Sequence, residues 1–184
     1  MGTRGLICIN KGKDNLFAID KSSDAYPQEL GIRILRWIKE RLDLDKLTQV
    51  LSDSTNQFGS DSPTILAYKY PEIADMLNDV QNYQGTFYNE LENYYFAASF
   101  QCQWAYVIDL ETKTFEVYQG GNTKTLAEDE RFKFLEEDAI RMNKTARHQM
   151  KPTPLPCKLL KKYSLDQLPD EDKLLKDCKC EGLV

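Results

Sequence analysis

The sequence predicts a single α+β domain over residues 1–184, in which helices pack on a mainly antiparallel sheet. Two β-rich runs, at 4–10 and 15–20, flank a turn and predict an N-terminal hairpin. A second pair of β-rich runs lies within 104–118, again around a turn. Apolar residues at helical spacing occupy much of the chain between these two hairpins. Segregated strands and helices of this kind are typical of an α+β fold.

Length, charge and hydropathy limit the class of protein. A chain of 184 residues can bury about two-thirds of its unfolded surface in one core. The formal net charge of -5 gives no reason to expect binding to a phosphate backbone, so nucleic acid is not a predicted partner. The N-terminus lacks the pattern of a signal peptide, and no apolar run approaches the roughly 18 residues of a membrane span. We therefore expect a cytoplasmic protein with no membrane partner.

The first hairpin includes a strand that is apolar on both faces. Leu6, Ile7, Cys8 and Ile9 are consecutive apolar residues, whereas an edge strand or half-exposed strand usually alternates. We expect this strand to lie in the middle of the sheet.

Three amphipathic helices are predicted after the hairpin. The first begins near Pro27, which suits the first helical position, and the second begins after Asp43 or Asp45 as its cap. Pro71 opens the third. Their apolar stripes are explained by core packing and need no cofactor. The stripes comprise Leu30, Ile34, Trp37, Ile38 and Leu42 in the first helix, Leu44, Leu47, Val50 and Leu51 in the second, and Ile73, Met76, Leu77 and Val80 in the third.

The second half of the chain returns to strands. Aromatic residues alternate along 104–108, a turn follows at 111–113, and the pattern continues to 117. The run 94–100 is a candidate neighbouring strand, 158–163 a last strand and 170–178 a terminal helix. The charged segment 124–151 is predicted to be a solvated helix and loop, and 178–184 a mobile tail.

The titratable residues exclude several chemistries. Five cysteines with no C-x-x-C pair suit free thiols in a reducing compartment. The only histidine, His148, lies in the charged segment with no adjacent carboxylate, which argues against catalytic units built on histidine. No phosphate-binding glycine loop or metal-binding motif is present, so we predict no cofactor and no metal.

The N-terminal residues offer the candidate site. Arg4 carries five donors that Asp20 or Asp24 could accept, which would fix the terminus to the following loop. Tyr26 lies beside them, and the four residues together predict a groove for a small molecule or peptide. A strand-borne Thr3 followed by a hairpin also resembles the N-terminal-nucleophile amide hydrolases and acyltransferases, in which the terminal amine acts as the base. Thr3 becomes terminal only after removal of the two residues that precede it.

Several sequence elements carry a second resemblance. The opening MGTRGL, the DAYPQELG after the first hairpin, the run WAYVIDLETKTFEVYQGG and the late KLLKKYSLDQLPDE together resemble an uncharacterised protein family found largely in fungi. In that family a similar terminus precedes a D-x-Y-P-x-x-L-G element, often after an Asn-His-Trp-Asp-like run. Here DKSSDAYP keeps Asp24 but lacks the histidine and tryptophan. The family implies no activity.

Three functions are open at this point. The leading hypothesis is a non-catalytic binding or interaction module whose groove uses Arg4, Asp20, Asp24 and Tyr26. The alternatives are the amide hydrolase or acyltransferase with Thr3 as nucleophile, and a homodimer joined through exposed tyrosines of 94–118, since tyrosine favours interfaces.

Overall fold

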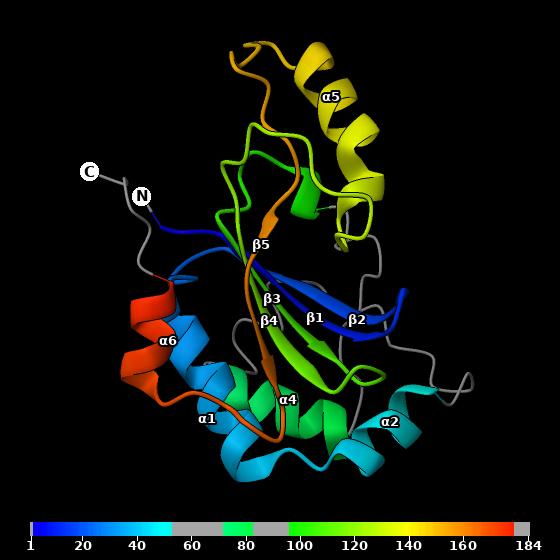
Figure 1. Ribbon diagram of the computed structural model, residues 1–184, viewed down its shortest axis with the longest axis vertical. Helices are drawn as coiled ribbons and strands as arrows, with labels where there is room; N and C mark the ends of the chain where they lie inside the picture. The colour runs from blue at the N-terminus through cyan, green and yellow to red at the C-terminus, as the bar shows by residue number, and fades with distance from the viewer. Residues whose placement is uncertain (1, 53–71, 83–95, 179–184) are drawn as a thin grey trace.

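A five-stranded sheet with the strand order β2-β1-β3-β4-β5 forms the centre of the molecule. The computed structural model describes residues 2–52, 72–82 and 96–178 (Figure 1). The central pair β1–β3 is parallel, and the other three pairs are antiparallel. The strands are β1 (Gly5–Lys11), β2 (Asp14–Lys21), β3 (Trp104–Asp109), β4 (Thr114–Gln119) and β5 (Lys158–Ser164). The predicted α+β class, the N-terminal hairpin and the central place of the first strand are confirmed.

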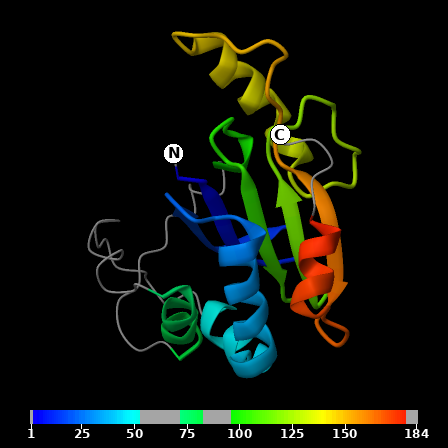
Figure 2. The same cartoon turned by 90° about the vertical axis from the view of Figure 1, so that its left-hand side faces the viewer.

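Of the helices in the described residues, four cover one face of this sheet and another lies apart from them (Figures 1 and 2). The covering helices are α1 (Ile32–Arg41), α2 (Leu44–Ser52), α4 (Ile73–Asn82) and α6 (Glu171–Asp177). A π-helical turn, η1 (Pro27–Gly31), leads into α1, and a 3₁₀ turn, η3 (Lys133–Leu135), leads into the separate helix α5 (Glu136–Thr145). Asp43 Oδ1 accepts from the backbone N–H of Lys46 at 3.0 Å, so Asp43 rather than Asp45 caps α2.

The helix-covered face holds the larger apolar core. Alternate residues of a strand point to opposite faces, and Ile7, Tyr106 and Phe115 point to this one. The rings of Tyr106 and Phe115 stack at 6.4 Å between centroids. Trp37 is almost fully buried among them, and its indole N–H donates to Asn78 Oδ1 at 2.9 Å, which joins α1 to α4.

Among the described residues, the opposite face is covered mainly by the segments 96–102 and 126–135, with Ala139 of α5 beside them. Leu6, Cys8 and Val107 point to this face and pack against the segment 126–135. The Phe132 ring meets the Tyr118 ring edge to face, with centroids 4.7 Å apart. Side chains on both faces of the sheet are therefore buried, one face mainly under helices and the other mainly under loops and short turns.

Some local predictions need correction. Residues 96–98 form a short 3₁₀ turn, not a strand, because β1 and β4 already occupy both sides of β3. Tyr106 and Tyr118 are buried within the chain, so they offer no surface to a dimer, and Tyr94 and Tyr95 lie outside the described residues. Cys178, predicted to begin a mobile tail, is buried in the main core.

The described parts of the chain contain no helix with the length and apolar character needed to cross a bilayer.

Candidate functional site

Thr3 lies inside the fold at the start of β1. Its side chain is 2% exposed, and its carbonyl accepts from the backbone N–H of Ala25 at 3.1 Å. The Oγ1 atom makes no hydrogen bond within the described residues. With Thr3 2% exposed, this hydroxyl is closed to a substrate in the conformation seen here. The role of Thr3 as a nucleophile stays a prediction.

Arg4 makes three contacts within the chain. One terminal nitrogen lies 3.5 Å from an Asp20 carboxylate oxygen, and the other donates to the side chain of Gln101. The guanidinium carbon lies 4.9 Å from the centre of the Phe96 ring, within cation–π range. Of the two acids predicted as partners, Asp20 pairs with Arg4. These contacts join β1, β2 and the 96–101 segment.

Asp24 and Tyr26 lie on the loop that follows β2. Asp24 is exposed, makes no ion pair with the described residues, and has a φ of 57°, a left-handed conformation that Asp tolerates better than most residues. Tyr26 is an exposed side chain. Between them Ala25 is anchored, because the Tyr106 hydroxyl donates to its carbonyl at 2.8 Å. The structure therefore joins Arg4 to Asp20 and places the other two predicted binding residues on the loop that Ala25 holds against Thr3.

A buried cluster of charged groups lies at the other end of the sheet. Arg131 donates from Nε to Glu116 at 2.9 Å, from one terminal nitrogen to Asp109 at 2.5 Å, and from the other to the carbonyl of Gly12 at 2.6 Å. The Arg131 side chain is 11% exposed, and the two carboxylates are 1–2% exposed. One arginine thus holds the 126–135 segment to β3, β4 and the β1–β2 turn.

The remaining acceptors of the two carboxylates are also occupied. Asp109 Oδ1 accepts from the backbone N–H groups of Gly12, Glu111 and Thr112 at 2.9–3.2 Å. Glu116 also accepts from the Tyr118 hydroxyl at 2.6 Å and lies 2.9 Å from Lys162 Nζ. The turn position of Gly12 has a φ of 61°, which glycine adopts at no steric cost. With every partner supplied by the chain, this cluster acts as a structural clamp.

The clamp controls the protonation of its members. Burial alone would raise the pKa of Asp109, but hydrogen bonds from Arg131 and from the backbone of Thr112 and Gly12 outweigh it and lower the pKa. Burial would also raise the pKa of Glu116, but Arg131, Lys162 and the Tyr118 hydroxyl together lower it by more, so the net pKa is lowered. Burial works against the charge of Arg131, yet the two carboxylates raise its pKa. Both acids therefore stay ionised at neutral pH.

An open groove of about 950 Å³ lies outside this clamp. Its wall is the 128–137 segment, with Lys13 from the β1–β2 turn on the far side. Phe134 is 59% exposed there, and the side chains of Glu128, Asp129 and Glu137 are exposed beside it. Arg131 also borders the groove, but its charge is matched by Asp109 and Glu116. Lys133 is paired with Glu136 and Glu128, and Lys13 is the exposed base of the lining, so exposed acids outnumber exposed bases around the aromatic ring.

Two acids in the same wall have structural partners. Glu130 accepts from the backbone N–H groups of Ala127 and Leu159 at 3.2–3.3 Å. Glu136 accepts from the backbone N–H of Leu126 at 2.6 Å and from Lys133 Nζ at 2.9 Å. These contacts, together with the clamp, fix the backbone on which the exposed groups are carried.

The described residues contain no group of three or more histidine, cysteine or acidic side chains placed to hold a metal ion. Cys8, Cys102, Cys157 and Cys178 are buried free thiols, and burial is the main cause that raises the pKa of the Cys8 and Cys102 thiols well above the ordinary value. No family model, curated protein or solved structure matches the chain. The resemblance to a fungal family stays a prediction.

Proposed function

We propose that this protein is a non-catalytic interaction module that binds a basic peptide segment in the groove formed by residues 128–137. The observation that carries the proposal is the exposure of Phe134 among ionised side chains on a backbone that is held in place. An aromatic ring surrounded by charged groups is typical of an interaction surface, because the ring supplies contact area and the charges select the partner.

Charge complementarity sets the chemistry of the partner. The exposed Glu128, Asp129 and Glu137 attract lysine or arginine side chains, and Phe134 offers a contact to an apolar side chain of the same segment. The Glu128 side chain is 91% exposed, and it lies 3.5 Å from Lys133 in the free protein. A bound cation would compete with this weak surface pair.

The groove differs from the binding site predicted at the N-terminus. The two terminal nitrogens of Arg4 already contact Asp20 and Gln101, and its guanidinium lies over the Phe96 ring, whereas its buried Nε makes no hydrogen bond with the described residues. The exposed acids of the groove have fewer partners and lie beside an exposed ring. For these reasons we place the binding surface at residues 128–137 rather than at residues 4–26.

Fluorescence anisotropy tests the proposal with two short labelled peptides, one alternating lysine with leucine and one alternating glutamate with leucine. We expect the lysine peptide to bind and the glutamate peptide not to bind. Phe134→Ala should weaken binding about tenfold, as expected when an interface loses a central aromatic side chain. Raising the salt concentration should weaken it further, since the acids are exposed.

Phe100→Ala is the matched control. Phe100 is exposed to a similar degree but does not line the groove. Its replacement should leave the affinity unchanged. Equal binding of both peptides, or equal losses in the two phenylalanine variants, would contradict the proposal.

A further inference from the structure

The outer face of α5 is a second exposed surface. The helix projects from the end of the sheet opposite α1, α2 and α4 (Figure 1), and Ala139 is its only fully buried residue. A helix with so little buried surface gains little from packing on its own chain.

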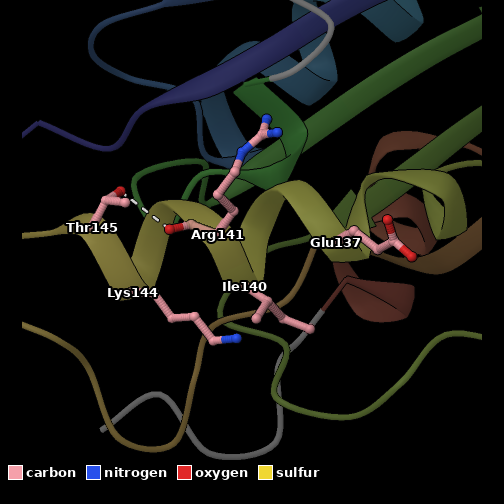
Figure 3. Close-up of a pocket in the computed structure, with 5 residues that line it drawn as sticks. All are labelled: Glu137, Ile140, Arg141, Lys144 and Thr145. Carbon is pink, nitrogen blue, oxygen red and sulfur yellow. Dashed lines mark hydrogen bonds between the residues drawn. The ribbon is translucent and has the colours of Figure 1, made fainter.

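One face of α5 combines acidic, apolar and basic residues. Glu137, Ile140, Arg141 and Lys144 are spaced three or four apart, so they share the face shown in Figure 3. They border a shallow hollow of about 390 Å³, and every described residue that lines it belongs to α5. Among the described elements, a partner that fills this hollow therefore contacts α5 alone.

The order of the charges indicates which partner fits. The acid stands near the N-terminal end and the bases near the C-terminal end, with Ile140, which is 36% exposed, between them. This order suits the dipole of α5 itself. It also makes the face complementary to the same face of a second, antiparallel α5. In that arrangement the acid of each helix lies opposite the bases of the other.

We propose that α5 pairs with α5 of a second copy of this chain in an antiparallel, two-fold arrangement. The axis passes near Ile140 and Arg141, so that Glu137 faces Lys144 of the second copy and Lys144 faces its Glu137. Ile140 lies against the aliphatic part of Arg141 from the second copy. Because the arrangement is two-fold symmetric, the Glu137–Lys144 ion pair forms twice, as contacts do in other isologous interfaces.

The interface is small, and this sets the expected affinity. A helix of ten residues is about 15 Å long, so the pair buries less surface than a standard stable interface. The dimer is therefore weak, and dissociates as salt screens its exposed charges. It differs from the tyrosine-mediated dimer predicted from the sequence. Although Glu137 borders both the groove and this face, the dimer does not require a bound peptide.

Sedimentation equilibrium of the full chain, over about 10 μM to about 1 mM where weak interfaces dissociate, tests the inference. The wild-type mass should rise with concentration toward that of a dimer. Glu137→Lys should weaken the dimer about tenfold or more, because it places like charges opposite each other. The double variant Glu137→Lys/Lys144→Glu reverses both charges and should restore association.

Glu40→Lys on α1 makes the same change of charge on an exposed site elsewhere, and should leave association unchanged. Circular dichroism checks that each variant keeps its helix content. A monomer at every concentration would overturn the inference. A dimer that persists in Glu137→Lys, or a double variant with native helix content that stays monomeric, would overturn it as well.

Discussion

Arg36 and Arg131 make the same type of contact in two different environments. Each holds carboxylate oxygens with Nε and a terminal nitrogen: Arg36 reaches Glu171 at 2.6 and 2.8 Å, and Arg131 reaches Glu116 and Asp109 at 2.9 and 2.5 Å. The first pair joins α1 to α6 at the surface, with Arg36 57% exposed. The second lies beneath the groove wall. Geometry alone does not set how much an ion pair contributes to the free energy of unfolding. When a buried pair loses one partner, the other is left as an uncompensated buried charge, whereas at the surface water solvates it.

The largest effect is expected for Arg131→Met. This change leaves Glu116 and Asp109 buried without their main cationic partner, and breaking a buried pair in this way costs about 3–5 kcal/mol. Chemical denaturation at pH 7 measures the loss. Arg131→Lys, which keeps the charge but not the planar fork, should cost less and provides a folded variant if the methionine variant does not fold. A loss below about 1 kcal/mol, the value typical of a surface pair, would show that the clamp has little energetic importance.

A smaller effect should appear in the pH dependence of that loss. The folded-state pKa values of Asp109 and Glu116 are lowered, so their contribution is present above the unfolded values of about 3.9 and 4.3 and is lost as the pH falls through the folded values. Without Arg131, burial dominates and favours the protonated carboxyls. The stability difference between wild type and Arg131→Met should therefore be small near pH 3 and grow toward pH 6.

Denaturation curves at several pH values measure this difference. Arg36→Met, compared with wild type over the same range, controls for the general loss of stability in acid. A difference for Arg131→Met that stays constant from pH 3 to pH 7 would contradict the assignment of the effect to the two carboxylates.

The smallest effect is expected for Arg36→Met at pH 7. Its partner Glu171 remains solvated at the surface, so the loss of the pair leaves no buried charge. The melting temperature should change by no more than the scatter between replicate measurements. A fall as large as that of Arg131→Met would remove the distinction between the two arginines.

Periodicity predicts the helix-covered half of this molecule well. The two hairpins, the stripe along α1 and the central place of β1 follow from apolar patterns that depend only on neighbours in the sequence. The turn at 96–98 was missed because its aromatic and small residues also suit a strand. Only the tertiary pairing of β3 with β1 and β4 excludes the strand there.

The clamp was missed for a different reason. Asp109 and Glu116 alternate with apolar residues, a pattern that usually marks a solvated face, and Arg131 stands in a charged run. A signal was nevertheless present, since Val107 and Tyr118 share the face of these acids and are apolar. An acid on an apolar face implies a buried partner, but the sequence does not indicate which cation supplies it. The same limit explains why the sequence predicts a site at Arg4 and does not indicate the groove at residues 128–137.

The location of peptide binding is the most direct test of this account. Titration of isotope-labelled protein with the lysine–leucine peptide, followed by backbone amide chemical shifts, reports it residue by residue. The account predicts the largest shift changes at residues 128–137 and none near Arg4, Asp20, Asp24 and Tyr26. Changes concentrated at those four residues, or no change at saturating peptide, would contradict it.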